Sequence, residues 1–159
     1  MHIHGASAVI DGEIKKQVCI KAVDGFITAI STNCSETPDS KHAGTLIPGF
    51  VDIHSHGGGG FYFSDLSPEN VAAARNTHLA RGTTTHIASL VTEPIGVLEE
   101  QILRLLPMVN AGVFEGIHLE GPYLSHARCG AHEPTLLRSP TITELSALID
   151  AGQGAISMV

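Results

Sequence analysis

Residues 46–60 read LIPGFVDIHSHGGGG, an apolar run that ends in His54, Ser55 and His56 and continues into four glycines. A short apolar run bounded by proline and glycine predicts a buried strand. In an extended chain, residues two apart point to the same side, so His54 and His56 face one side of this strand. A single cation can bind both imidazoles there, and Gly57 to Gly60 allow the backbone to turn sharply away from it.

Length and composition indicate one globular core. The chain has 159 residues, of which 43% are hydrophobic. No apolar run approaches the roughly 18 residues that cross a membrane, and the N-terminus has no signal-peptide pattern. These features predict a cytoplasmic protein with no membrane partner. The net charge of −7, with only nine Lys and Arg, disfavours nucleic acid as a partner, because phosphate neutralisation needs clustered cationic side chains.

The cysteines and histidines set the possible metal chemistry. Cys19, Cys34 and Cys129 are an odd number without paired spacing, which argues against a disulfide framework and against a cysteine zinc knuckle. We therefore expect reduced thiols. The ten histidines are the compositional outlier.

The pattern along the chain changes near Pro48. Residues 1–47 contain three strand-like segments, 3–10, 17–23 and 26–30, with Asp11-Gly12 and Asp24-Gly25 placed as two-residue hairpin turns. A polar connection follows over residues 31–41. We expect a small antiparallel β unit over residues 1–47.

Residues 48–159 alternate between strand and helix patterns. Strands are predicted over 50–53, 83–91, 113–119 and 155–159, and helices over 67–81, 94–110 and 143–151. Ser67-Pro68-Glu69 is a typical helix start, and Gly82 is a typical stop. Alternating strands and helices predict parallel β/α units, so the fold class is α/β.

Side chains at the carboxyl ends of parallel strands meet at one edge, where the chemistry of such folds collects. His54 and His56 end the first of these strands, and Glu120 ends the third. Two imidazoles and a carboxylate suit a divalent cation such as zinc, iron or manganese. The plain alternatives are a chance histidine pair, as at His2 and His4, which we assign to a surface or sheet, and a loop carboxylate at Glu120.

Four further residues have both a structural and a functional interpretation. His118 shares the strand of Glu120 and is a candidate substrate group, although a core histidine fits it better. His86 has the same ambiguity, and His78 is expected on a helix in a structural role. Cys129 beside Arg128 has no paired base for nucleophilic catalysis.

Three segments together resemble a known family. PGFVDIHSHG at 48–57 looks like the metal-binding signature of the amidohydrolase superfamily, and HLEGPYLS at 118–125 with CGAHEP at 129–134 is similar to N-acetylglucosamine-6-phosphate deacetylases. The resemblance implies that Glu120 is a metal ligand, that His54 and His56 hold an additional metal, and that Ala131 and His132 contact the amino sugar. One or two zinc, iron or manganese ions per subunit are implied.

The family's fold is a (β/α)₈ TIM-like barrel preceded by a small β-sandwich. The resemblance therefore implies that residues 1–47 are part of the sandwich and residues 48–159 the first portion of the barrel. The family's reaction is hydrolysis of the acetamide of N-acetylglucosamine 6-phosphate to glucosamine 6-phosphate and acetate. Members of the family are commonly homodimers, so the resemblance also implies a homodimer. The family's catalytic aspartate and two further histidine ligands would lie beyond Val159, so we expect an incomplete and inactive fragment.

Two other classes of protein stay open at this point. A cyclic amidohydrolase of the dihydroorotase or hydantoinase type shares the paired histidines but more often uses a barrel lysine, whereas this chain has Glu120 in HLEGP. A non-catalytic half-barrel that binds or oligomerises is the other alternative, because part of the ligand set is missing.

Overall fold

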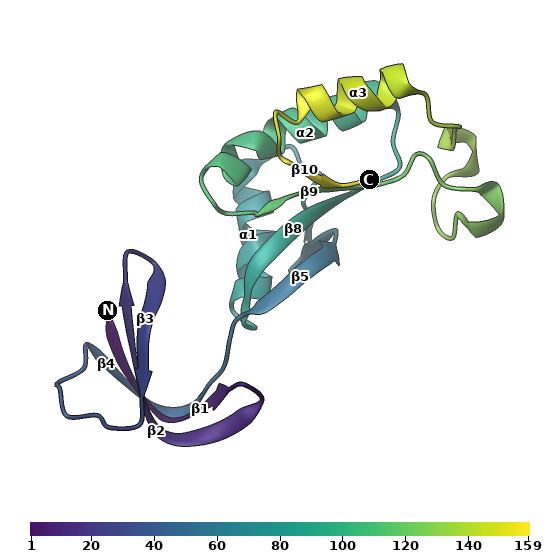
Figure 1. Ribbon diagram of the computed structural model, residues 1–159. Helices are drawn as coiled ribbons and strands as arrows, with labels where there is room; N and C mark the ends of the chain where they lie inside the picture. The colour runs from purple at the N-terminus through teal and green to yellow at the C-terminus, as the bar shows by residue number, and fades with distance from the viewer. The chain divides into compact units, whose positions relative to one another are not determined.

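The computed structural model describes residues 1–159 and divides the chain into two compact units, Met1–Pro48 and Gly49–Val159 (Figure 1). The first unit is a β-sheet, and the second is a parallel sheet with helices. No helix in either unit has the length and apolar character needed to span a membrane. The chain is therefore mixed α/β, with its two kinds of architecture separated at residues 48 and 49.

The first unit is a single four-stranded sheet in the order β3-β2-β1-β4. Its strands are β1 (His2–Ile10), β2 (Glu13–Val23), β3 (Phe26–Ser31) and β4 (Ser40–Leu46). The two hairpin turns have positive φ angles throughout: 52° and 78° at Asp11 and Gly12, and 50° and 82° at Asp24 and Gly25. Such values define the two-residue turns that match strand twist, so both predicted hairpins are confirmed.

The prediction of a purely antiparallel unit is wrong for its last strand. β4 runs parallel to β1, with Ile3 opposite Ser40 and Ala8 opposite Leu46. The segment SKHAGTL has no alternating apolar pattern and is mostly exposed. Its strand conformation therefore comes from pairing with β1, a tertiary contact that local sequence does not encode.

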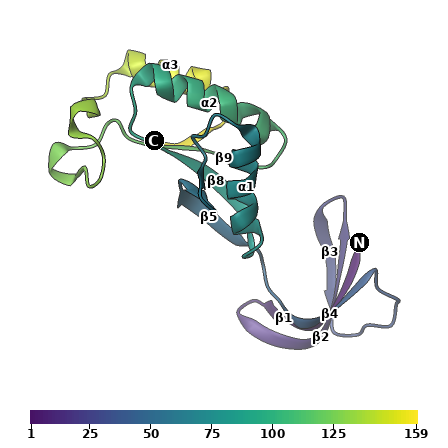
Figure 2. The ribbon, with the colours of Figure 1, turned by 180° about the vertical axis from the view of Figure 1, so that it is seen from behind.

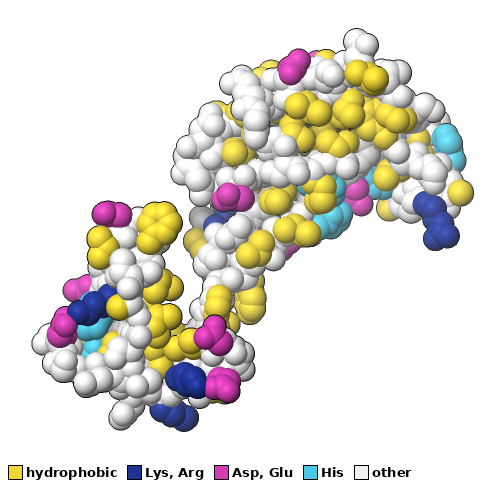
Figure 3. Space-filling model, viewed as in Figure 1, with side chains coloured by type: hydrophobic (Ala, Val, Ile, Leu, Met, Phe, Trp, Pro, Cys, Tyr) yellow, Lys and Arg dark blue, Asp and Glu magenta, His cyan; other side chains and the backbone are white.

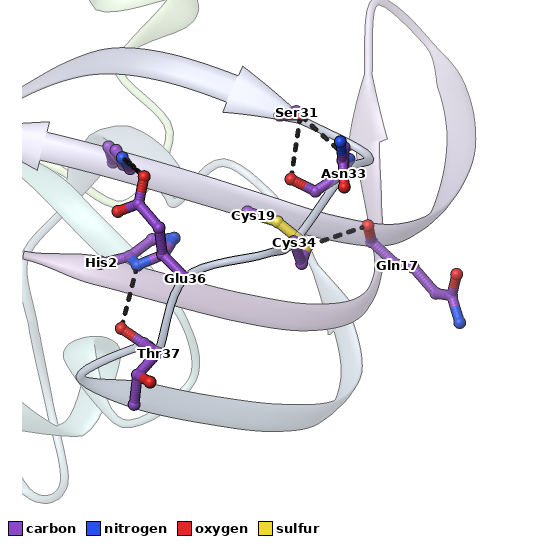
Figure 4. The surroundings of a disulfide bond; sticks show 9 residues. His2, Gln17, Cys19, Ser31, Asn33, Cys34, Glu36 and Thr37 are labelled. Atoms are coloured by element: carbon purple, nitrogen blue, oxygen red, sulfur yellow. Dashed lines mark hydrogen bonds and ion pairs between the residues drawn. A yellow bond between two sulfur atoms is a disulfide. The ribbon is translucent and has the colours of Figure 1, made fainter.

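The expectation of three reduced thiols is also wrong. Cys19 and Cys34 form a disulfide across 15 residues, with Cα atoms 5.6 Å apart (Figure 4). Cys19 is buried on β2, and Cys34 follows β3 in the connection to β4. The β2–β3 hairpin brings the two together, and two cysteines can be bridged only when folding places their Cα atoms this close. Cys129 is a free thiol.

The second unit carries a four-stranded parallel sheet in the order β10-β9-β8-β5. Its elements are β5 (Phe50–Ser55), β6 (Gly57–Gly58), β7 (Phe61–Tyr62), α1 (Pro68–Leu79), β8 (Thr83–Val91), α2 (Ile95–Asn110), β9 (Gly116–Glu120), η1 (His126–Arg128), η2 (Pro134–Leu136), α3 (Ile142–Ala151) and β10 (Ile156–Met158). The predicted alternation and its parallel pairing are confirmed. The short β6–β7 hairpin, built on the glycine run, was not predicted.

The helix boundaries follow the local signals. The Ser67 side chain accepts a hydrogen bond from the Asn70 amide at 3.4 Å, and Pro68 occupies the first turn of α1. Gly82, with φ at 100°, follows the end of this helix. α3 begins in the same way, because Thr141 Oγ1 accepts from the Glu144 amide at 3.2 Å. Capping of exposed amide groups explains both starts.

The three helices pack on one face of the sheet, as Figures 1 and 2 show from opposite sides. Strand alternation sends Leu90, Ile117 and Leu119 into a core with side chains from all three helices; Val71, Ala74, Leu98, Ile102, Leu105 and Leu148 are among these. The next residues along β9, His118 and Glu120, must then face the opposite side. The sheet thus separates an apolar core from a polar, histidine-bearing face.

At the edge of this sheet, β5 exposes apolar side chains. Phe50, Val51 and Ile53 are 55%, 64% and 54% exposed. Parallel strands are ordinarily buried on both faces and are therefore rich in apolar side chains. A strand at the edge of an open parallel sheet is expected to expose such side chains.

Candidate metal centre

The strand ends of the second unit bring the predicted ligands together. His54 lies on β5, His56 follows that strand immediately, and Glu120 is the last residue of β9. β8 separates these strands and pairs in parallel with each. The three side chains form one cluster, with ligand atoms all within 4.8 Å of one another. Figure 3 shows histidine and acidic side chains next to each other on the face of this unit away from the helices.

Glu120 is the centre of this cluster. Its Oε2 atom lies 2.8 Å from His56 Nε2 and 3.7 Å from His54 Nε2. The two imidazole rings are 5.1 Å apart at 89°. The Glu120 side chain is 29% exposed, so the cluster is open to solvent on one side. Two nitrogen atoms and one oxygen atom thus point at a common, reachable volume.

Hydrogen bonding supports one ring orientation at His56. Its Nδ1 atom lies 3.1 Å from the Ser89 carbonyl oxygen on β8. Nδ1 therefore donates to this carbonyl, and Nε2 faces Glu120, where a bound cation would take the place of a proton shared with the carboxylate. A backbone carbonyl on the far nitrogen is the usual support of a metal-binding histidine. By this criterion, and by the chemistry of its donor atoms, the cluster fits a divalent cation such as zinc, iron or manganese.

The segment after β9 brings His132 to the other side of the carboxylate. His132 Nε2 lies 3.6 Å from Glu120 Oε1, and His132 Nδ1 lies 2.7 Å from Thr92 Oγ1. The Thr92 hydroxyl also donates to the Glu120 carbonyl at 3.2 Å. His132 is therefore held in place beside the cluster, and Ala131 lines the same 200 Å³ hollow with Val91, Thr92 and Glu133.

Gly121 is required by this arrangement. Its φ angle is 92°, and a Cβ atom there would collide with Thr92 Oγ1. Glycine accepts this backbone conformation without steric cost. The Glu-Gly step in HLEGP therefore allows the chain to leave β9 tightly enough to keep Thr92 against it.

His118 lies two residues before Glu120 on β9, and its side chain therefore points to the same face of the sheet. Its ring is 5.2 Å from that of His54, and its Nδ1 is 3.1 Å from Ser89 Oγ. The side chain is buried, and this burial, followed by the nearby His54, lowers the pKa of His118. A neutral, hydrogen-bonded imidazole beside the cluster is consistent with both interpretations of His118, as a substrate-binding group and as a core histidine.

A second group of side chains supports β5 from the helix side. His86 is 1% exposed, and its Nε2 lies 2.6 Å from Ser55 Oγ. His78 on α1 contacts the Gly57 carbonyl through Nε2 at 2.9 Å and lies 3.8 Å from Asp52. Burial lowers the pKa of His86 to about 4. These contacts hold Ser55 and Gly57, the residues on either side of His56, so His78 and His86 have structural roles.

Sequence reasoning missed Ser55, Ser89 and Thr92, which orient the histidines. Thr92 follows the end of β8 directly, so the rule that strand ends carry the site could have found it. Ser55 and Ser89 could not be found this way, because a serine in a strand is usually a plain packing residue.

Similar proteins support these observations. No protein-family model matches the chain. It is 32% identical over 149 residues to N-acetylgalactosamine-6-phosphate deacetylase of Shewanella sp. (strain ANA-3), an alignment that covers 88% of the chain and 38% of that protein. It is 30% identical over 155 residues to N-acetylglucosamine-6-phosphate deacetylase of Bacillus subtilis (strain 168), with coverages of 90% and 39%.

A solved structure resembles the whole chain. It is an alanine variant of Mycobacterium smegmatis N-acetyl-D-glucosamine-6-phosphate deacetylase in complex with N-acetyl-D-glucosamine-6-phosphate. The TM-score is 0.90 at 38% identity, and the match covers 100% of this chain and 42% of the solved one.

The fold and the histidine and glutamate cluster define a homologue of the metal-dependent amidohydrolases. More particularly, the chain is a homologue of the N-acetylglucosamine-6-phosphate deacetylases and corresponds to the N-terminal part, about 40%, of the full-length enzymes. It spans 38% and 39% of the two curated relatives described above.

Proposed function

We propose that this chain supplies the N-terminal part of a metal-dependent deacetylase site for N-acetylglucosamine 6-phosphate. The observation that carries the proposal is the convergence of His54, His56 and Glu120 at the carboxyl ends of two parallel strands in a homologue of such deacetylases. The reaction is hydrolysis of the acetamide to glucosamine 6-phosphate and acetate.

Amide hydrolysis needs both an activated water molecule and a polarised carbonyl group. A divalent cation, when bound, supplies both by lowering the pKa of water and by withdrawing electron density from the carbonyl oxygen. Glu120 provides the negative charge that holds such a cation, and His54 and His56 provide neutral nitrogen donors. The Ser89 carbonyl keeps the His56 proton on the nitrogen atom that faces away.

His132 and Ala131 are proposed to contact the sugar. His132 projects beside Glu120 and is only 11% exposed, and the hydroxyl of Thr92 holds its Nδ1. Since the Thr92 hydroxyl donates to the Glu120 carbonyl, His132 Nδ1 donates to Thr92, and its Nε2 is available to accept a hydrogen bond from a sugar hydroxyl. Ala131 leaves room in the hollow next to it, where a larger side chain would occupy the space.

The complete site needs more than these residues. Amide hydrolysis also requires a general base that takes a proton from water and returns it to the leaving amine. We propose that an aspartate, the remaining histidine ligands and the later strands of a (β/α)₈ barrel correspond to the part of the relatives that this chain does not match. The first unit would then belong to a β-sandwich, and the full-length enzyme would be a homodimer.

The epimeric sugar is a second candidate substrate. Two relatives that cover 88% of the chain are N-acetylgalactosamine-6-phosphate deacetylases. The two sugars differ only in the configuration of one hydroxyl group. A site that hydrogen-bonds this hydroxyl would reject the other epimer, because a buried polar group would then be left without its partner.

Acetate release from both phosphorylated sugars tests the proposal. It is measured for the 159-residue chain and for any longer product of its reading frame, before and after removal of divalent metal with a chelator. We expect metal-dependent release of acetate from N-acetylglucosamine 6-phosphate by a longer product that supplies the remaining ligands and the aspartate, and none by the 159-residue chain alone. Release from the galactosamine epimer alone would favour the second candidate, and an absence of metal dependence would contradict both.

A further inference from the structure

The first unit contains another histidine pair, at His2 and His4 on β1, next to the Cys19–Cys34 disulfide. Ligand atoms of His2, His4 and Cys19 lie within 4.8 Å of one another. His4 and Cys19 are directly opposed across the β1–β2 ladder. Cys34 joins the group because its sulfur is bonded to that of Cys19. Two nitrogen and two sulfur atoms therefore gather on one face of this sheet.

We propose that His2, His4, Cys19 and Cys34 form a tetrahedral zinc site when the disulfide is reduced, so that this unit alternates between a disulfide and a zinc centre. Two imidazoles and two thiolates are the ligand set of structural zinc sites. A tetrahedral ion with bonds of about 2.3 Å to sulfur holds two sulfur atoms about 3.8 Å apart. The ligand atoms of His2, His4 and Cys19 already lie within 4.8 Å of one another, whereas the two bonded sulfur atoms must first separate.

The two histidines are prepared for a cation in different ways. His2 Nδ1 lies 3.4 Å from the Thr37 carbonyl oxygen, which directs its Nε2 lone pair away from that carbonyl (Figure 4). His4 Nε2 is buried without any hydrogen-bond partner. A buried polar atom without a partner costs free energy, and a bound cation would satisfy it.

The sulfur atoms are reachable and one of them can move. Cys34 is partly exposed in the connection between β3 and β4, whereas Cys19 is fixed on β2. Hollows of 220 Å³ and 640 Å³ flank Cys34, and these are lined by His2 and His4 respectively. A reductant can approach through either hollow, and a shift of the loop that carries Cys34 would open the sulfur pair to the separation zinc needs.

The nearby charges do not prevent cation binding. Lys21 pairs with Glu36 at 2.6 Å, which removes most of its effect on the site. Lys41 stands beside His4 and opposes a cation. The two thiolates of the reduced state contribute two negative charges, which outweigh this single positive charge.

The chemistry balances with a reductant of the thiol or phosphine class. Two electrons and two protons convert the disulfide into two thiols, while two thiol molecules become a disulfide or one phosphine becomes its oxide with oxygen from water. Zinc binding then releases the two thiol protons. A two-electron oxidant such as a diazene takes two electrons from the two thiolates and two protons from solvent to become a hydrazine, which restores the disulfide and expels the ion.

Cobalt substitution of the 159-residue protein tests the proposal, because thiolate-to-cobalt charge transfer appears only when sulfur binds the ion. The Glu120→Gln variant is used as background so that the second unit contributes no ion. We expect no charge-transfer band in the oxidised protein. After reduction by a phosphine, one cobalt ion should bind and give this band, and oxidation by the diazene diamide should abolish it. Zinc should displace the cobalt one for one.

Matched variants identify the ligands. Cys34→Ser and the His2→Ala plus His4→Ala double variant should lose the band or its tetrahedral pattern, and Cys129→Ser should keep both. A reduced protein with three titratable thiols and no band would overturn the proposal. An unchanged band with its tetrahedral pattern in Cys34→Ser would do the same, and so would loss of the β-sheet circular dichroism on reduction, since the site depends on that sheet.

Discussion

Two histidine pairs with the same spacing lie in the two units of this chain, and their surroundings differ. His2 and His4 have ring centroids 4.8 Å apart at 82°, and His54 and His56 have centroids 5.1 Å apart at 89°. Strand geometry alone accounts for this similarity, because alternate residues share a face. Spacing in sequence therefore determines how the two rings stand to each other.

The partners of each pair depend on the sheet that contains it. The first pair stands on an antiparallel ladder opposite Cys19, and the second ends a parallel strand in a sheet whose β9 brings Glu120. Sulfur donors favour a closed structural zinc centre, whereas a carboxylate and an open side favour a catalytic ion. The same His-x-His motif thus supports two different proposals.

Glu120→Gln gives the largest expected difference between the pairs. The substitution keeps the shape of the side chain and removes the charge that holds a cation between His54 and His56. Deacetylation should fall by more than the roughly 100-fold lost when an outer-shell partner is removed. Most metal should be lost from the second unit, while reduced protein keeps the cobalt–thiolate band of the first.

Acetate release and metal content by mass spectrometry measure this effect. Glu100→Gln is the matched control, because Glu100 is an exposed carboxylate on α2, outside the cluster, and pairs with Arg104. Normal turnover with full metal occupancy in Glu120→Gln would remove this residue from the site.

Removing each histidine pair separately makes the comparison direct. In oxidised protein, His54→Ala plus His56→Ala should lower the bound metal by one ion per chain, whereas His2→Ala plus His4→Ala should leave it unchanged. The reason is that the disulfide occupies both sulfur donors of the first unit. Metal analysis after dialysis against zinc checks both variants. Equal losses from the two variants would contradict the assignment of different chemistry to the two units.

Acid should destabilise the second unit through His86, whose ring contacts Ser55 between His54 and His56. The folded-state pKa of His86, about 4, lies below its ordinary value of 6.5, so its neutral form stabilises the fold above pH 6.5. This contribution is lost as the pH falls from 6.5 to 4, by about 3 kcal/mol for a shift of this size. Urea unfolding at pH 7 and at pH 4, with hydrogen exchange of β8 amides, measures it.

His86→Met should remove most of this pH dependence, because methionine has no proton to gain. His126→Ala, which changes an exposed histidine of the same unit, should retain it. An unchanged pH slope in His86→Met would assign the acid sensitivity to other groups.

His132→Ala has the smallest expected effect. The loss of one hydrogen bond to substrate should raise KM about 10-fold, since such a bond contributes about 1–1.5 kcal/mol. Metal content should stay near normal, because His132 lies 3.6 Å from Glu120 on the side away from the histidine pair. His126→Ala is again the control. Steady-state kinetics with unchanged KM would exclude His132 from the substrate site.

Much of the second unit could be predicted from local patterns. The Ser67 cap, the β-branched run of residues 83–91 and the strand that ends at Glu120 each carry a strong signal within a few residues. Parallel pairing then follows from the alternation of strands and helices, and it requires His54, His56 and Glu120 to meet at one edge.

The remaining features depend on contacts between distant segments. The parallel pairing of β4, the Cys19–Cys34 bond and the support of His132 by Thr92 join residues that are 15 to 40 positions apart in sequence or lie in different strands. No periodicity or spacing records such contacts. The odd number of cysteines wrongly suggested that all three thiols are reduced. In the structure two cysteines are bonded to each other and the third stays free.

The sequence by itself determined the two histidine pairs, their shared spacing and the strand ends on which the second pair and Glu120 lie. These depend on backbone geometry, which repeats every two residues in any strand. Only the tertiary structure decided which atoms face each pair, cysteine sulfur for His2 and His4 and a carboxylate for His54 and His56. The choice of ligand depends on which strands become neighbours, and that is settled only when the sheets assemble.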